Sequence, residues 1–264
     1  MTPRTVVQML IRNEADIIEE CLREIARWGL TEIVILDGQS DDGTPDVVRA
    51  FTGADIHLVS EPDPDGRFHD HLRNRLMNLT LQHNPEWIVS LDADEIYHTD
   101  PVAAIRAAVL GGANVVRCHV PQFWITTDDV RRGILVEDRR ESIQVRRRWY
   151  SWGHMGTFIW RVQPGHYYPQ GIAKRTPEVR GQTWREWQRA GPVYPICKHY
   201  CFRTLEQGVA RAAARRKRGG RRYFGKYFEN WIIDEKAAGL HYWNGVWQTS
   251  ENHRAVCEYM GRRT

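Results

Sequence analysis

Short apolar runs alternate with segments of helical periodicity along the first part of this chain. Runs rich in β-branched residues and bounded by turn residues are typical of buried strands, whereas apolar positions three and four residues apart are typical of helices. Strands are expected at residues 5–11, 32–36, 56–59, 87–91 and 114–120. Helices are expected between them, at residues 17–26, 45–51, 68–83 and 101–110. This alternation predicts an α/β fold with a mostly parallel, doubly wound sheet and helices on both of its faces.

The alternation ends near residue 120. Residues 121–200 hold short apolar runs with Trp, Gly and Pro, and this pattern predicts loops and antiparallel strands. Residues 204–218 have an apolar helical face, and residues 223–264 predict an aromatic-rich helical tail. The second part of the chain is therefore expected to depart from the strand–helix alternation.

Polar clusters directly follow three of the predicted strands. They are Arg12, Asn13 and Glu14 after the first strand, Asp37 and Gly38 after the second, and Asp92, Ala93, Asp94 and Glu95 after the fourth. Parallel strands end at the same edge of a sheet, and ligands of such sheets bind beyond that edge. The pattern therefore predicts one ligand site formed by the three clusters.

Asp92 and Asp94 are separated by one residue, so their carboxylates project from the same side of an extended chain, roughly 7 Å apart at the Cβ atoms. Mg²⁺ and Mn²⁺ prefer oxygen ligands and take few of them from protein. The two carboxylates can share such a cation with a bound diphosphate. A solvated turn is the alternative, but the apolar run 87–91 places the pair at the end of a buried strand.

Other polar residues can complete this site. The Asp37 carboxylate can accept from a nucleobase N–H or a ribose hydroxyl, and Arg12 can reach a phosphate. Asn13 and Glu14 can instead cap the first helix, and Thr44 is expected to cap the next one. Later in the chain, a neutral His199 can supply a third metal ligand, with Lys198 or Arg203 holding a diphosphate, although a structural role is the alternative for this histidine.

Several of these stretches resemble the family 2 glycosyltransferases of the GT-A fold. The similar stretches are Val6–Ile18, Ile33–Thr44, Leu72–Asn74, Trp87–Glu95, which is similar to the family's W-x-x-x-L-D-A-D-E, and His199–Gln207, which looks like the H-Y-x-x-[KR]-[ST]-x-E of related transferases. The resemblance covers residues 5–120 well and residues 197–218 moderately. It implies a Rossmann-like GT-A sheet and a transferase that uses a nucleotide-sugar.

The resemblance also implies roles for single residues. Asp37 would bind uracil or another base, and Arg73 would lie near the nucleotide. Asp92 and Asp94 would bracket the ribose-diphosphate and a divalent metal, Mn or Mg, with Asp94 the direct ligand and His199 completing the metal site. The donor would be a UDP-sugar in the favoured case, and the reaction would invert the anomeric centre.

The general base of the reaction is left open. Related transferases often carry a His-Glu pair after an Arg-rich strand, whereas here Arg146-Arg147-Arg148 is followed by His154 and then by Met155. The candidates for the base are Glu95, Asp138 and His154, with Asp129 and Glu137 as further carboxylates.

On this resemblance, we expect residues 1–200 to form the transferase domain, with a nucleotide-sugar half at 1–120 and an acceptor half at 121–200. Residues 201–264 would form a basic, aromatic helical extension packed on it. The length of 264 residues suits one α/β domain with a small extension.

The net charge of +4 is a weak signal, but basic residues concentrate between Arg203 and Lys226. Such a patch attracts polyanions. The residues expected in it are Arg215, Arg216, Lys217, Arg218, Arg221 and Arg222. The acceptor can therefore be a glycan or lipid-linked glycan, or a hydroxymethylated base in nucleic acid such as modified DNA, and a solvated helix face is the third interpretation.

Cysteine usage and hydropathy bear on the compartment. The five cysteines form no C-x-x-C pair, which favours a reducing compartment, and no stretch approaches the ~20 apolar residues that span a bilayer. We expect a cytoplasmic protein, in one alternative peripheral at the inner membrane surface.

Two other function classes are compatible with part of the pattern. A nucleotidyltransferase also uses paired carboxylates and a metal, but it normally has a Gly-rich phosphate loop that Arg12-Asn13-Glu14 does not supply. A non-catalytic nucleic-acid-binding protein on the same fold would not need the intact acidic cluster.

Overall fold

The computed structural model describes residues 2–62, 71–133, 141–152, 155–169, 177–182, 184–201, 203–204 and 232–248, together with 252 and 255. By their internal contacts, the residues divide into two compact units. The first unit holds residues 1–119 and 155–197, and the second holds residues 120–154 and 198–264. The boundaries of these units differ from those of the expected halves, 1–120 and 121–200. The assignment of these halves to the nucleotide-sugar and the acceptor stays a prediction.

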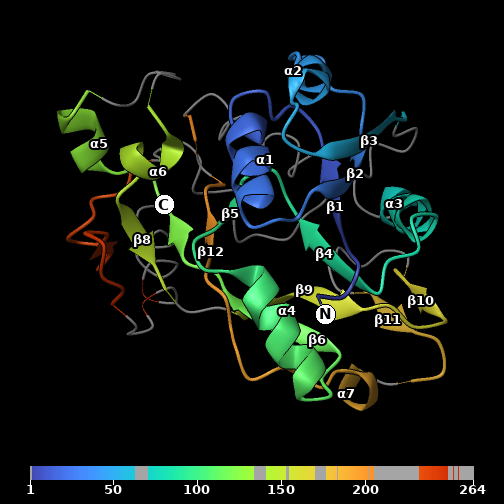
Figure 1. The fold of residues 1–264 in the computed structure, drawn as a ribbon. Coiled ribbons are helices and arrows are strands. Elements are labelled where there is room, and N and C mark those ends of the chain that lie inside the picture. The colour runs from blue at the N-terminus through green and yellow to red at the C-terminus, as the bar shows by residue number, and fades with distance from the viewer. Residues whose placement is uncertain are drawn as a thin grey trace. The chain divides into compact units, whose positions relative to one another are not determined.

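A mixed sheet forms the centre of the first unit, in the order β3-β2-β1-β4-β9-β6 (Figure 1). Its strands are β1 (Thr5–Ile11), β2 (Glu32–Asp37), β3 (Asp55–Ser60), β4 (Trp87–Leu91), β6 (Val115–His119) and β9 (Met155–Arg161). The first four strands pair in parallel, as the alternation of strands and helices predicted. The expected α/β fold with a mostly parallel sheet is therefore confirmed.

Four helices of this unit follow the predicted periodicity. They are α1 (Ile18–Arg27), α2 (Thr44–Ala50), α3 (His71–Leu81) and α4 (Pro101–Leu110). The short helix α7 (Trp184–Trp187) was not predicted, because loops and antiparallel strands were expected there. Gly29, at φ 78°, takes the left-handed conformation just after α1, which few other residues adopt without strain. Thr44 does not cap α2: the cap is Gly43, and the Thr44 hydroxyl bonds to a neighbouring loop instead.

Alternate residues of the central strands are buried on opposite faces of the sheet. On one face, Val6 and Leu10 of β1 pack with Val34 and Leu36 of β2 against the leucines of α3. The residues between them, such as Val7 of β1, have no exposed surface either. Because side chains alternate across a strand, both faces of the sheet are covered.

The order of β4, β9 and β6 in the sheet differs from the order of these strands along the chain. The fifth predicted strand is β6, but it does not pair with β4, because β9 lies between them and runs antiparallel to both. After β9, the short strands β10 (His166–Tyr167) and β11 (Glu178–Val179) form an antiparallel pair. Antiparallel strands were expected in residues 121–200, but their insertion into the central sheet was not.

A smaller sheet forms the centre of the second unit, in the order β13-β8-β7-β12. Its strands are β7 (Gln122–Phe123), β8 (Trp149–Ser151), β12 (Cys197–His199), which begins at the unit boundary, and β13 (His241–Tyr242). Two short helices, α5 (Thr127–Arg131) and α6 (Ile143–Arg146), belong to the same unit. A cluster of aromatic rings, including Phe123, Tyr150 and Tyr200, packs among these elements.

The expected helical tail, residues 223–264, differs from the structure over residues 232–248. Residues 232–248 contain turns and β13 rather than a helix. In this segment, the ring of Trp243 packs against that of Trp247, and the ring of Tyr242 packs against Trp149 of β8. Residues 205–231, and with them the predicted helix 204–218 except its first residue, lie outside the described residues. In the part of the chain that the structure describes, no helix combines the length and the apolar character that a membrane crossing needs.

Candidate functional site

The register of the central strands brings the three polar clusters to one edge of the sheet. Ile11 of β1 pairs with Asp37 of β2, and Met9 pairs with Leu91 of β4. The loops that follow these residues therefore leave the sheet side by side, at the carboxyl ends of parallel strands. The expectation that the clusters lie at one edge is confirmed.

Hydrogen bonds fasten the loop after β1 to the loop after β2. The Asn13 side chain donates to Asp41 at 2.8 Å and accepts from its backbone N–H at 3.0 Å. The backbone N–H of Glu14 donates to Thr44 Oγ1 at 2.8 Å, and the Glu14 carbonyl accepts from the first N–H groups of α1. Asn13 and Glu14 thus shape the edge of the site, while Arg12 is exposed beside them.

Asp37 is buried, and its carboxylate already has several partners. It accepts from the Ser40 backbone N–H and hydroxyl and from the Ser60 hydroxyl at 3.1 Å. A carboxylate offers about four lone-pair sites, so part of its capacity to accept hydrogen bonds remains. The geometry gives Asp37 a structural role in the loop after β2, and its contact with a nucleobase stays a prediction.

The acidic cluster forms a tight turn between β4 and the short strand β5 (Glu95–Tyr97). The Glu95 backbone N–H donates to the Asp92 carbonyl at 3.1 Å, and the Glu95 carboxylate accepts from the Asp92 backbone N–H at 3.1 Å. Asp92 is half-buried, whereas Ala93, Asp94 and Glu95 are buried. The turn therefore holds the two aspartates one residue apart at the edge of the sheet.

Negative charge accumulates around this turn. The Cys21 thiol of α1 donates to the Glu95 carbonyl at 3.3 Å. Burial raises the pKa of Cys21 well above its usual range, and the nearby charges of Glu95, Asp94, Glu20 and Glu14 raise it further. Such a concentration of carboxylates is stabilised by a cation.

Tyr168, which the sequence did not single out, is buried against Gln8 of β1 and Ser90 of β4. The Tyr168 hydroxyl accepts from Gln8 Nε2 at 3.0 Å, and its backbone is held by both atoms of the Asn74 amide, at 2.7 and 2.8 Å. Burial raises the pKa of Tyr168 to about 12, with the Arg73 charge and the bonds from Gln8 and Ser90 acting in the opposite direction. Arg73 and Tyr168 therefore lie close together.

The sequence of β1 and β4 contains an indication that a residue such as Tyr168 packs against them. Gln8 and Ser90 are buried polar residues inside otherwise apolar strands, which normally indicates a specific hydrogen-bond partner. The sequence does not say which distant residue supplies that partner. Asn74 belongs with Arg73 to the stretch that resembles the family. Its described hydrogen bonds go to the Tyr168 backbone, so they give Asn74 a structural role.

The candidates for the general base are placed only in part. Glu95 is buried in its turn, and Asp129 is buried in the capping box of α5, where it accepts from the Thr126 backbone N–H at 2.8 Å. Glu137, Asp138 and His154 lie outside the described residues. The identity of the base therefore stays a prediction.

The remaining donor candidates belong to the second unit. Lys198 is buried, with its Nζ 4.7 Å from the centre of the Trp243 ring and 3.5 Å from Gln144 Oε1. His199 is half-buried in β12, and Arg203 is buried, with its carbonyl accepting from Arg147. The polyanion patch, Arg215, Arg216, Lys217, Arg218, Arg221 and Arg222, lies outside the described residues.

The donor atoms at the strand edge fit a hard divalent cation. Asp92 and Asp94 supply carboxylate oxygens in an acidic environment, which is what Mg²⁺ and Mn²⁺ select. Within the described residues, no group of three or more His, Cys, Asp or Glu side chains could by itself hold a metal ion. Asp92 and Asp94 belong to the first unit and His199 to the second, so the three-residue metal site stays a prediction.

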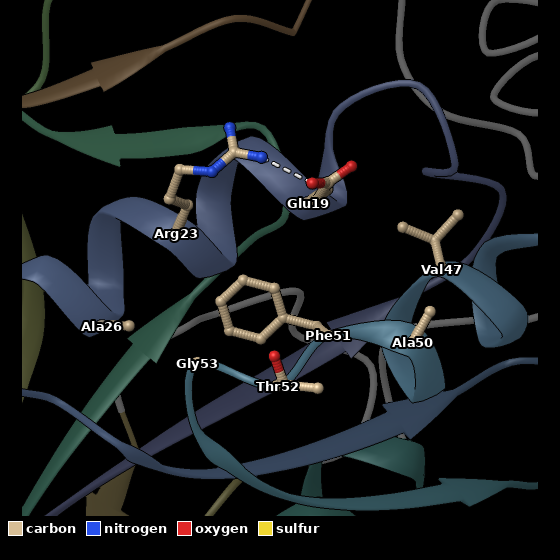
Figure 2. A pocket seen from close by; sticks show the side chains of 8 residues that line it. All are labelled: Glu19, Arg23, Ala26, Val47, Ala50, Phe51, Thr52 and Gly53. Atoms are coloured by element: carbon tan, nitrogen blue, oxygen red, sulfur yellow. Dashed lines mark hydrogen bonds and ion pairs between the residues drawn. The ribbon is translucent and has the colours of Figure 1, made fainter.

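A separate cavity of about 550 Å³ lies between α1 and the end of α2. Figure 2 shows the Phe51 ring and the ion-paired Glu19 and Arg23 at this cavity. Its other lining residues are Ala26, Val47, Ala50, Thr52 and Gly53. None of the predicted site residues lines it, so it is not the site expected from the sequence.

Comparison with known protein families gives a match that covers the strand-edge clusters. A family model with the description "Glycosyl transferase family 2" matches residues 7–163, which is more than half of the chain. The match includes β2, β4 and most of β1, with all three polar clusters. No curated protein matches the chain.

Proposed function

The chain belongs to glycosyl transferase family 2 and is a glycosyltransferase, and we propose that it moves a sugar from a nucleotide-sugar to an acceptor hydroxyl with the help of a divalent metal. A UDP-sugar is the favoured donor, and the anomeric centre is inverted. The observation that carries the proposal is the convergence of the Asp37 loop and the Asp92–Glu95 turn on one edge of the sheet.

In this proposal, the donor binds at the carboxyl ends of β1, β2 and β4. Asp37 contacts the base or ribose, and Arg12 and Arg73 supply positive charge toward the phosphates. Asp92 and Asp94 hold Mn²⁺ or Mg²⁺, with Asp94 the direct ligand. The metal, when bound, neutralises charge on the departing nucleoside diphosphate. Lys198, Arg203 and His199 are the residues of the second unit proposed to complete this site.

The transfer forms one bond and breaks another at the anomeric carbon. The acceptor oxygen attacks that carbon, the bond to the diphosphate oxygen breaks with its electron pair, and a general base takes the proton of the acceptor hydroxyl. The products are the glycosylated acceptor, the nucleoside diphosphate and the protonated base. Asp138 and His154 are the residues proposed for the base, because the third candidate, Glu95, already accepts from the Asp92 backbone N–H in its own turn.

The acceptor is proposed to be a glycan or lipid-linked glycan, or a hydroxymethylated base in nucleic acid. The basic run between Arg203 and Lys226 supports an anionic acceptor of either kind. Salt-titrated binding to duplex DNA and to anionic vesicles distinguishes these acceptors, because binding through phosphate neutralisation weakens steeply with salt.

The test is a coupled assay of nucleotide release. The purified protein is incubated with a panel of UDP-sugars and Mn²⁺, with EDTA in a parallel reaction, and free UDP is measured. We expect UDP release from at least one donor, lost with EDTA and restored by metal. Release of a sugar 1-phosphate instead of UDP would indicate a nucleotidyltransferase, because attack at the α-phosphate of a UDP-sugar expels that group. No release from any of the UDP-sugars would contradict the proposal.

A further inference from the structure

The second unit buries more positive than negative charge among its described residues. Its buried charged side chains are Arg146, Arg147, Lys198, Arg203, Asp129 and Glu235. Glu235 is already bound by the exposed guanidinium of Arg131, at 2.5 Å. Asp129 therefore remains as the buried carboxylate that faces the arginines. Buried charges are normally paired, because taking a charge out of water without a counter-ion is costly.

The contacts of Asp129 do not satisfy Arg147. One Asp129 oxygen accepts from the Thr126 backbone, and the other lies 3.8 Å from Arg147 Nη1, beyond hydrogen-bond distance. Arg147 Nη2 donates to the Arg203 carbonyl. Its Nε and Nη1 groups have no hydrogen-bond acceptor among the described residues, although only 1% of the residue is exposed.

Two further guanidinium groups lie next to Arg147. Arg146 is 7% exposed, and no residue that the structure describes supplies an acceptor to its Nε. Arg132 donates to the Arg146 carbonyl at 3.3 Å and lies 4.0 Å from Asp129. Burial lowers the pKa of Arg147, Asp129 opposes this effect, and the charges of Arg146 and Arg132 lower the pKa further. Among the described residues, the three arginines thus repel one another around one carboxylate, that of Asp129.

We propose that Arg132, Arg146 and Arg147 form an oxyanion site in the second unit that binds a phosphate group. A guanidinium offers N–H groups in a planar fork that matches phosphate oxygens, and a phosphate carries the negative charge that this cluster lacks. The Arg132 side chain is 27% exposed, so the cluster opens to solvent on its side.

The phosphate can come from two sources, an acceptor that carries a phosphate group or the diphosphate of the donor. The existence of the site follows from the second unit alone. Its assignment to a phosphorylated acceptor deepens the proposed function and rests on it. Binding is therefore measured without turnover, so that a failure of the site and a failure of the transferase proposal are distinguishable.

The first experiment is calorimetric titration of the full chain with inorganic phosphate and, separately, with UDP. Wild type is compared with Arg146→Gln, which removes one guanidinium, and with Lys236→Gln, which removes the same charge from an exposed position of the same unit. We expect Arg146→Gln to weaken phosphate binding roughly tenfold or more, since hydrogen bonds to charged partners contribute that much, and Lys236→Gln to leave it unchanged.

The UDP titration identifies the source of the phosphate. If Arg146→Gln weakens phosphate binding but not UDP binding, the site serves an acceptor phosphate. If it weakens both and UDP displaces phosphate from wild type, the site serves the donor. Both results support an oxyanion site, whereas equal phosphate affinity in wild type and Arg146→Gln, or no binding by wild type, overturns it.

A measurement on wild type alone covers the case in which the variant does not fold. Phenylglyoxal modifies accessible arginines, and peptide mass spectrometry reports each position. We expect phosphate to protect Arg132, the partly exposed member of the cluster, from modification but not the exposed Arg49 of the first unit. Equal modification of Arg132 with and without phosphate overturns the proposal.

Discussion

At the scale of single residues, the turn after β4 gives its carboxylates different positions. Asp92 and Asp94 stand at the sheet edge, while the Glu95 carboxylate bends back and accepts from the Asp92 backbone N–H. Glu95 is 1% exposed, so an acceptor hydroxyl would have to displace this bond to reach it. The geometry therefore favours Glu95 as a residue that shapes the turn.

Replacing Glu95 distinguishes the turn role from the base role. We expect Glu95→Gln, which keeps an acceptor oxygen, to retain turnover with an unchanged pH profile, and Glu95→Ala to lower the free energy of unfolding by about 1–3 kcal/mol. Turnover kinetics and urea denaturation measure the two effects, with Glu19→Gln on the exposed face of α1 as the control. A loss of turnover near 100-fold in a stable Glu95→Gln variant would instead identify Glu95 as the base.

At the scale of elements, the β10–β11 pair packs next to the central sheet through the neighbouring residue Tyr168, which bonds to Gln8 of β1. It carries Tyr168 next to β10, where Asn74 of α3 holds the Tyr168 backbone. The His166 ring of β10 packs edge-to-face on Trp187, with ring centres 5.3 Å apart. Within the described part of the chain, both ring nitrogens of His166 lack a hydrogen-bond partner, and burial lowers the pKa of this histidine to about 4.

This histidine predicts acid sensitivity of the first unit. Between pH 6.5 and about 4 the unfolded chain binds a proton at His166 that the folded chain does not, so the free energy of unfolding falls as the pH falls through this window. Because the ring is partly exposed, we expect a loss of roughly 1–2 kcal/mol. His166→Phe should remove this loss in urea denaturation at a series of pH values. The same substitution at exposed His57 should not, and an unchanged pH dependence in His166→Phe would contradict the account.

The same elements show what the sequence could and could not predict. β1, β2, β4 and α4 have periodic patterns of sufficient length, and their positions agree with the expected ranges within a residue or two. β9 carries no alternation that marks it as a member of the central sheet. Tyr168 bonds to Gln8 across 160 residues of sequence, a separation over which periodicity carries no information.

At the scale of the whole molecule, the chain combines an α/β unit with a second unit rich in aromatic and basic residues. The first unit holds the carboxylates proposed for the donor and the metal, and its sheet was predictable because each strand–helix repeat is local. The second unit is assembled from segments 120–154 and 198–264, so its composition was visible in the sequence but its buried arginine cluster was not.

The central claim is that a metal and the donor diphosphate bind at the carboxyl edge of the sheet. The most direct test compares Asp94→Asn with Asp55→Asn. Asp55 begins β3, so the control makes the same change at the opposite edge of the same sheet, on an exposed side chain. Metal-dependent UDP release is measured for both, with thermal unfolding as the check of folding.

We expect Asp94→Asn to lose UDP release by about 100-fold or more while its unfolding temperature stays close to that of wild type. Asp55→Asn should behave as wild type in both measurements. Undiminished, Mn²⁺-dependent UDP release by a folded Asp94→Asn variant would contradict the account.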